Sequence, residues 1–153
     1  MPQNFLYIGL IATSFPEAKI LHIKRNPAAV CWANYKQWFK SKDLSYSYSI
    51  DDTIQYYRLY EDLINFWKKL FNNKIYDVDY ETLTINHEDE IKKLIKYLDL
   101  NWEEECLYPE KNKRAVTTAS NKQIRDKIFK GSSQKWKNYK PFLDGALDSL
   151  DKK

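Results

Sequence analysis

Two short segments with strand character, separated by sequence with helical character, constrain the fold of this chain most. Residues 19–25 (KILHIKR) alternate in polarity, and residues 74–80 (KIYDVDY) place Tyr76, Val78 and Tyr80 on one face. The intervening sequence has apolar side chains three and four residues apart, which is typical of helices. Strands connected through helices favour a parallel βαβ arrangement and the α/β class. Two strands are too few for an independent sheet, so residues 1–153 predict a single, incomplete domain.

Helices are predicted on both sides of these strands. The first spans residues 4–14, and Phe15-Pro16 ends it. The second begins at Pro27, with Asn26 as its N-cap, and runs to about Phe39. The other predicted elements are a loop at 41–49, a long helix capped by Asp51 or Asp52 and ended by Asn72-Asn73, a helix capped by Asn86, a short helix from Asn101 to about Leu107, and a last helical segment from Ser132 or Ser133.

Glycine is unusually scarce in this sequence. Only Gly9, Gly131 and Gly145 occur, whereas a domain of this size has about ten glycines at average usage. A glycine-rich phosphate loop needs several glycines close together. The 153 residues therefore contain no such loop.

Composition also argues against several classes of protein. Cys31 and Cys106 stand far apart without metal-ligand spacing, which argues against a disulfide framework and a zinc site, and we expect no metal. The net charge of +4 is too small to indicate nucleic acid as a partner. Neither a transmembrane run of about 18 apolar residues nor a signal peptide is visible, so we expect a cytoplasmic protein.

Each predicted strand ends at a residue that can contact a ligand. Arg25 ends the first strand and precedes the helix start at Asn26-Pro27, a position where open α/β sheets bind ligands and helix N-termini attract anions. A surface arginine paired with a carboxylate is the alternative. Tyr80 ends the second strand and can stack on a base, although core packing is the more common role. His22, in mid-strand, is expected to be a satisfied core residue.

The most basic stretch lies near the C-terminal end of the sequence. Residues 111–140 contain ten Lys and Arg but a single acidic residue, Asp126. Such a run is often only a solvated face. The interleaved Ser, Thr and Gly residues also suit a phosphate site, since hydroxyls and backbone N–H groups beside cations bind phosphate.

Three segments together resemble the sulfotransferases that use 3′-phosphoadenosine 5′-phosphosulfate (PAPS), and most closely the bacterial enzymes related to tyrosylprotein sulfotransferases. They are FPEAKILHIKRNPAAVCWANYKQWF, IYDVDYETL and NKRAVTTASNKQIRDKIFKGSSQKWKNYKPFL, and the resemblance covers essentially the whole chain. It implies a partial P-loop-type sulfotransferase fold: helices around a small parallel sheet, without the N-terminal phosphosulfate-loop unit. It also implies PAPS as co-substrate and an acceptor hydroxyl on a protein tyrosine, a carbohydrate or a small alcohol.

The same resemblance implies roles for individual residues. Arg25 would bind the 3′-phosphate and Tyr80 the adenine, Ser120 would lie at the 5′-phosphosulfate as the catalytic residue, and Lys130, Gly131 and Lys135 would contact the nucleotide. One position departs from the family pattern, because Ala33 stands where a serine usually follows the arginine by eight residues. The missing hydroxyl is expected to cost about 0.5–1.5 kcal/mol of binding free energy. Asn34 is the candidate replacement.

Activity is not expected from these 153 residues alone, because the resemblance places the phosphosulfate loop and the general base in a preceding segment. The alternative to an enzyme fragment is a non-catalytic nucleotide-binding remnant or an interaction module. A nucleic-acid binder fits least well, since neither a stacking platform nor a recognition-helix pattern accompanies the basic run.

Overall fold

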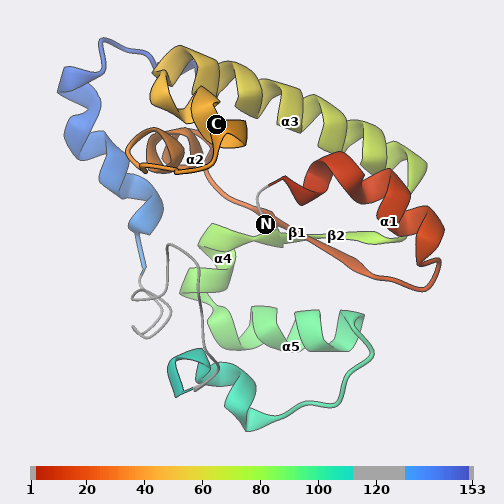
Figure 1. The fold of residues 1–153 in the computed structure, drawn as a ribbon. Coiled ribbons are helices and arrows are strands. Elements are labelled where there is room, and N and C mark those ends of the chain that lie inside the picture. The colour runs from red at the N-terminus through yellow and green to blue at the C-terminus, as the bar shows by residue number, and fades with distance from the viewer. Residues whose placement is uncertain (1–2, 112–129, 152–153) are drawn as a thin grey trace. The chain divides into compact units, whose positions relative to one another are not determined.

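The structure, a computed structural model, describes residues 3–111 and 130–151. The chain divides into two compact units: unit 1 consists of Met1–Asp77 and Ser133–Lys153, and unit 2 of Val78–Ser132. The regular elements among the described residues are helices and a small parallel sheet of two strands, in the order β1-β2 (Figure 1). The predicted α/β class is thus confirmed.

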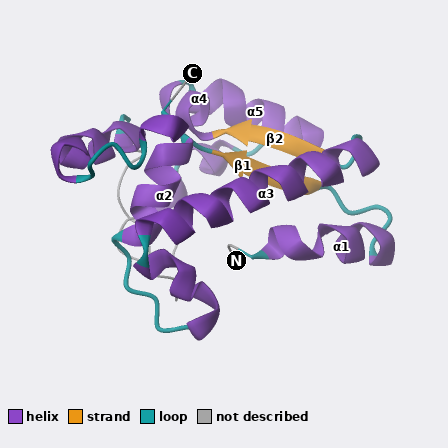
Figure 2. Ribbon diagram, turned by 90° about the horizontal axis from the view of Figure 1, so that it is seen from above, coloured by secondary structure: helices purple, strands orange, loops and turns teal. Residues whose placement is uncertain are grey.

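Both predicted strands are present. β1 spans Ile20–Lys24 and β2 spans Ile75–Asp79, and they lie side by side in Figure 2. The backbone N–H of Ile20 donates to the carbonyl of Lys74 at 2.8 Å at the start of the pairing. Tyr80, predicted to end the second strand, is instead the first residue of the following helix, because the Asp79 side chain accepts a hydrogen bond from the N–H of Thr82 at 2.8 Å and caps that helix.

The helices of unit 1 largely follow the prediction, with corrections at their ends and a 3₁₀ segment within the predicted loop at 41–49. The elements are a 3₁₀ turn η1 (Asn4–Tyr7), α1 (Ile8–Ser14), α2 (Pro27–Tyr35), a 3₁₀ segment η2 (Lys42–Tyr48) and α3 (Ile50–Leu70). Asn26 caps α2 as predicted, by accepting from the N–H of Ala29 at 2.9 Å, but α2 ends before the predicted Phe39. Ser49 caps α3 instead of Asp51 or Asp52, by accepting from the N–H of Asp52 at 3.2 Å.

Unit 2 contains one helix that the sequence pattern did not separate. Its elements are α4 (Tyr80–Ile85), α5 (His87–Tyr97) and the 3₁₀ turns η3 (Glu104–Leu107) and η4 (Pro109–Lys111). Asn86 stands at the N-cap of α5 as predicted, although its side chain makes no capping hydrogen bond. Glu103, not Asn101, precedes η3. After the residues that the structure does not describe, the chain continues as η6 (Ser132–Phe142), which includes Pro141, and η7 (Asp148–Leu150).

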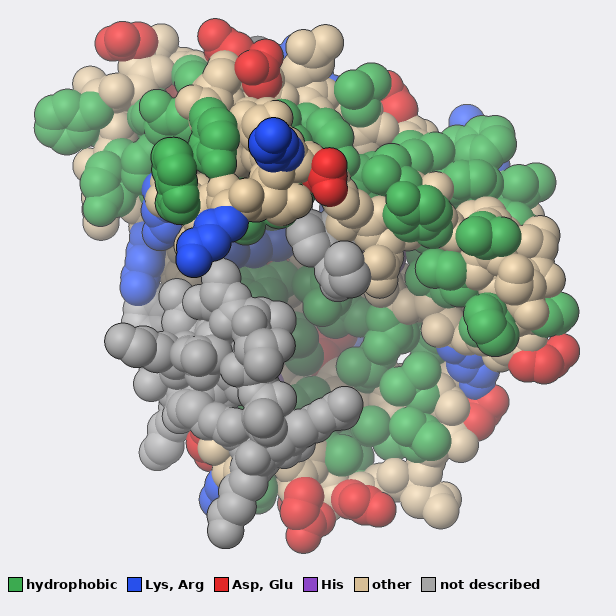
Figure 3. Space-filling view, viewed as in Figure 1, with side chains coloured by type: hydrophobic (Ala, Val, Ile, Leu, Met, Phe, Trp, Pro, Cys, Tyr) green, Lys and Arg blue, Asp and Glu red, His purple; other side chains and the backbone are tan. Residues whose placement is uncertain are grey.

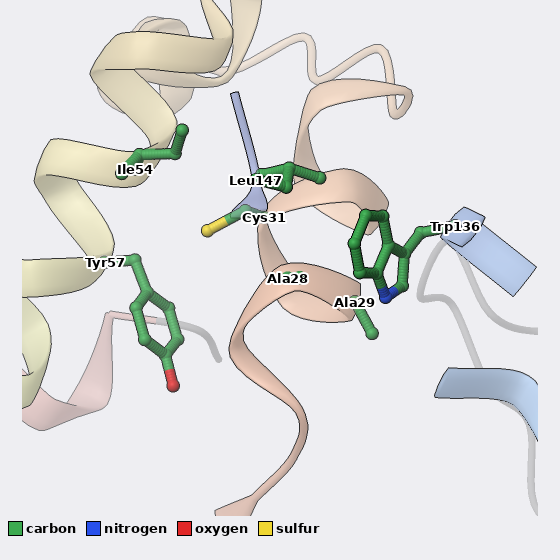
Figure 4. Packing of buried hydrophobic residues seen from close by; sticks show 7 residues of the cluster. All are labelled: Ala28, Ala29, Cys31, Ile54, Tyr57, Trp136 and Leu147. Carbon is green, nitrogen blue, oxygen red and sulfur yellow. The ribbon is translucent and has the colours of Figure 1, made fainter. Parts of the chain in front are cut away.

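The larger core of unit 1 joins α2 and α3 to the C-terminal residues of the chain (Figure 4). Its buried members are Ala28, Ala29, Cys31, Ile54, Tyr57, Trp136 and Leu147. Burial raises the pKa of the Cys31 thiol to about 12, so this side chain packs as a neutral, apolar group. Ser133 and Trp136 are both buried and stand three residues apart in η6, which places them on one face of a 3₁₀ helix. The core therefore fixes the position of η6 relative to α2.

A second core cluster holds α1 against α3 and the start of β2. Ile8, Ile64 and Ile75 are its buried members. A Cβ atom on Gly9 would lie only 2.7 Å from the ring of Trp67, so the close approach of α1 to α3 requires glycine there. Leu6, Tyr7, Leu10 and Phe15 remain exposed, and Figure 3 shows hydrophobic side chains gathered over α1. None of the helices in the described residues is long and apolar enough to cross a membrane.

Candidate functional site

Arg25 lies just beyond the carboxyl end of β1 and immediately before the N-cap of α2. Its Nε–H donates a hydrogen bond to the Oγ of Ser133 at 2.9 Å. Only 3% of Ser133 is exposed, so its hydroxyl occupies a fixed position in the core. The C-terminal segment thus supplies a buried anchor for the arginine side chain.

A cavity of about 590 Å³ in unit 1 extends along β1 to Arg25. This volume lies within the range of small-molecule sites. Its walls are mainly apolar and aromatic, and include Phe5, Ile8, Ile20, Ile23, Val30, Tyr46, Tyr56, Tyr57, Tyr60 and Ile64. Lys19 and Arg25 contribute the positive charge, and none of the described residues that line the cavity is acidic. The cavity therefore favours a ligand that combines an apolar or aromatic body with an anionic group.

The face of α2 that lines this cavity includes Val30 and Asn34, which are one helical turn apart. Ala33 is not among the lining residues. Asn34 therefore lines the same cavity as Arg25. A residue that replaces the missing serine at position 33 would need this location. Its amide group can donate hydrogen bonds to an anion.

A hydrogen-bonded cluster of His22, Tyr60, Asp77 and Lys68 lies farther along β1. His22 Nδ1 lies 2.7 Å from Asp77 Oδ1, and Nε2 is hydrogen-bonded to the Tyr60 hydroxyl. The Lys68 ammonium donates to Asp77 Oδ2 at 2.5 Å. His22 is thus satisfied, as predicted, but it is not the expected core residue, because its side chain is 11% exposed, lines the cavity and belongs to neither core cluster.

The ionisable groups of this cluster influence one another. Burial acts to raise the pKa of Asp77, but the hydrogen bonds from Lys68 and His22 outweigh it and lower that pKa below its ordinary value. Burial, aided by the nearby carboxylates of Asp77 and Glu61, raises the pKa of Tyr60 to about 12. At neutral pH the cluster therefore combines a charged Asp77 with a protonated Tyr60 hydroxyl.

Tyr80 lies in unit 2, where its hydroxyl is 3.0 Å from the Oγ of Ser132. It is only partly buried and belongs to neither core cluster. Two consecutive serines thus contact the two predicted strand-end residues, Ser132 in unit 2 and Ser133 in unit 1. The sequence predicted both serines as a possible helix start and Ser132 also as one of the hydroxyls of a phosphate site in the basic run, but it predicted no contact with Arg25 or Tyr80. Their place directly after the Lys130-Gly131 pair was the available signal.

The other predicted nucleotide-contacting residues surround these serines. Lys130 and Lys135 are exposed on either side of the start of η6. Gly131 has a φ of +81°, which side chains other than hydrogen rarely tolerate. Ser120 lies outside the described residues. Among the residues that the structure describes, no group of three or more His, Cys, Asp or Glu could hold a metal ion.

Comparisons with known proteins agree with this picture of the chain. A model described as the Sulfotransferase family matches residues 1–104, which include Arg25 and Tyr80. The chain is also similar to an uncharacterized protein of Aquifex aeolicus (strain VF5), with 38% identity over 152 residues. That match covers 98% of this chain but 20% of the relative, so the chain spans about a fifth of the relative's length. This chain belongs to the sulfotransferase family.

Proposed function

We propose that residues 1–153 form the C-terminal, nucleotide-binding part of a PAPS-dependent sulfotransferase domain, with Arg25 binding the 3′-phosphate. The observation that carries this proposal is the position of Arg25. It stands at the carboxyl end of β1, in the wall of an apolar cavity whose described lining residues include no acidic side chain. Its Nε–H donates a hydrogen bond to the buried Ser133. A phosphate at this position would also lie near the N-terminus of α2, where backbone N–H groups favour negative charge.

The family resemblance assigns nucleotide-binding roles to other residues of the chain as well. Tyr80 contacts the adenine, and Lys130, Gly131 and Lys135 contribute cationic and backbone donors from the C-terminal segment. Support for these roles comes from the family resemblance and from the hydrogen bond between Tyr80 and Ser132 within unit 2. Taken one by one, an arginine, two lysines and a glycine turn are of the kind that offers hydrogen-bond donors to phosphate oxygens.

The proposed reaction is an in-line transfer of the sulfuryl group. The acceptor oxygen forms a bond to sulfur while the bond from sulfur to the 5′-phosphate oxygen breaks, and the acceptor proton passes to a base. The products are a sulfated acceptor and adenosine 3′,5′-bisphosphate. Ser120 would donate to the bridging oxygen, where negative charge develops. The acceptor is a protein tyrosine, a carbohydrate or a small alcohol, and the resemblance to tyrosylprotein sulfotransferases favours tyrosine.

A non-catalytic nucleotide-binding remnant or interaction module is the second candidate. The observation that favours it is the presence of only three, widely separated glycines, which provide no loop for the 5′-phosphosulfate. Under this alternative the chain still binds adenosine 3′,5′-bisphosphate through Arg25. We therefore expect the 153-residue chain to bind this nucleotide without turning over PAPS.

Calorimetric titration tests the shared nucleotide-binding step. The chain is titrated with adenosine 3′,5′-bisphosphate and, separately, with adenosine 5′-monophosphate, which lacks the 3′-phosphate. We expect clearly tighter binding of the bisphosphate. Equal affinity for the two nucleotides would exclude Arg25 as a 3′-phosphate ligand, and turnover of PAPS with a phenolic acceptor would contradict the expected inactivity.

A further inference from the structure

We propose that Ser133 is the positioning residue for Arg25 and thereby supplies, from the C-terminal segment, the hydroxyl that position 33 lacks. This inference rests on the proposed function, because it concerns the 3′-phosphate site built around Arg25. It assigns a specific task to a residue outside the matched residues 1–104.

Core packing, and not contact with a ligand, fixes the position of Ser133. Its side chain is 3% exposed, and Trp136, three residues later on the same face of η6, is 1% exposed. Trp136 packs in the cluster that includes Ala28 and Ala29 of α2. The Ser133 hydroxyl therefore has a defined position relative to the beginning of α2, which directly follows Arg25.

The hydrogen bond to Ser133 selects one orientation of the guanidinium group. An arginine side chain has several rotatable bonds, whereas its planar guanidinium must be fixed to bind a phosphate in bidentate fashion. The Nε–H is already donated to Ser133 Oγ at 2.9 Å. By restricting the guanidinium, Ser133 reduces the orientational freedom that phosphate binding would otherwise have to remove.

Ser133 also has the chemistry that Ala33 lacks. A hydroxyl accepts through its lone pairs and donates one hydrogen. The Ser133 Oγ uses this acceptor capacity on the Nε–H of Arg25. Ala33 has no polar side-chain atom and can do neither. Ser133 of η6 thus gives Arg25 a hydroxyl partner, which Ala33 of α2 does not provide.

Loss of the hydroxyl in Ser133→Ala should weaken binding of adenosine 3′,5′-bisphosphate about 10-fold, equivalent to about 1.4 kcal/mol. Binding of adenosine 5′-monophosphate should change less than about 2-fold, because this ligand has no phosphate at Arg25. In an Arg25→Ala background, Ser133→Ala should cause no further loss, because its effect passes through the arginine. Affinities are measured by calorimetry on the full 153-residue chain.

Ser47 provides a matched control. It is fully buried in unit 1, and the described residues offer its hydroxyl no hydrogen-bond partner. Ser47→Ala should therefore leave both nucleotide affinities unchanged. If thermal unfolding shows that Ser133→Ala does not fold, Ser133→Cys replaces it, since sulfur is a weak acceptor of similar size and should also reduce the preference for the bisphosphate.

The outcomes separate this inference from the proposed function. Equal losses for both nucleotides, or an additive loss in the Arg25→Ala background, would overturn the role of Ser133 while leaving Arg25 as the phosphate ligand. Unchanged bisphosphate binding in Ser133→Ala, or in Ser133→Cys if that variant is used instead, would also overturn the role of Ser133. A wild-type chain with no preference for the bisphosphate would instead overturn the proposed function.

Discussion

His22 and Arg25 are only three residues apart on β1 and the turn that follows it, yet their surroundings differ in kind. The partners of His22 are Asp77 of β2 and Tyr60 of α3. Arg25 lies beyond the strand, and a neutral hydroxyl from η6 accepts its Nε–H. Both residues line the cavity, but both ring nitrogens of His22 are bound within the protein, whereas Arg25 lies at the carboxyl end of the strand, where a ligand can bind. Asp77 does not line the cavity, so we expect its loss to affect stability and loss of Arg25 to affect binding.

Arg25→Ala gives the largest expected effect on the binding side of this comparison. Loss of a bidentate, charge-assisted contact should weaken adenosine 3′,5′-bisphosphate binding by about 2–3 kcal/mol, roughly 30- to 150-fold. Calorimetry measures the affinity. Arg58→Ala is the matched control, because Arg58 is an exposed arginine whose Nη2 donates to Ser149 at 3.3 Å. Similar losses in both variants would show that general positive charge, and not a site at Arg25, attracts the nucleotide.

Asp77→Asn should reveal the stabilising role of the His22 cluster. The substitution removes the charge that interacts with His22 and Lys68. Because the Asp77 side chain is 43% exposed, solvent screens these interactions, and we expect a loss of about 1 kcal/mol in the free energy of unfolding at pH 7. Urea denaturation measures it, with the exposed Asp62→Asn as control. Nucleotide affinity should stay unchanged, and its loss would mean that the two regions of β1 are not independent.

The pH dependence of the unfolding free energy tests whether Asp77 stabilises the chain through its charge. The pKa of Asp77 is lower in the folded chain than in the unfolded chain, so its contribution is fully present above the ordinary Asp pKa of about 3.9. The contribution is lost as the pH falls through the lower, folded-state pKa. The difference in unfolding free energy between wild type and Asp77→Asn should therefore shrink between pH 5 and pH 2.5. A difference that stays constant over this range would contradict a charge-based role for Asp77.

Asn34→Ala should give the smallest effect of the series. Asn34 lines the cavity with Arg25, and its amide is a neutral donor, so we expect about a 3-fold loss of bisphosphate affinity, or about 0.7 kcal/mol. The comparison variant is Asn73→Ala, a change at an exposed asparagine beyond the end of α3. An unchanged affinity in Asn34→Ala would leave Ser133 as the only candidate replacement for the missing serine.

Local sequence rules predicted those parts of the fold that depend on neighbouring residues. Asn26-Pro27 specifies the start of α2, and the alternating polarity of residues 20–24 specifies β1. The same rules failed at Tyr80. Its place in an alternating pattern predicted a strand, but the Asp79 side chain caps a helix there and ends the strand one residue earlier. Two local signals competed at this position, and the pattern alone did not show which one prevails.

The α/β class, the position of Arg25 between a strand and a helix, and membership of the sulfotransferase family could all be predicted from the amino-acid sequence. Those features depend on residues close together in the chain. The folded chain was needed to show that Ser133, 108 residues away, accepts a hydrogen bond from Arg25, and that Asn34 and not Ala33 lines the cavity. Such contacts depend on core packing, here on Trp136 against α2, which brings distant segments together without leaving a periodic pattern in either.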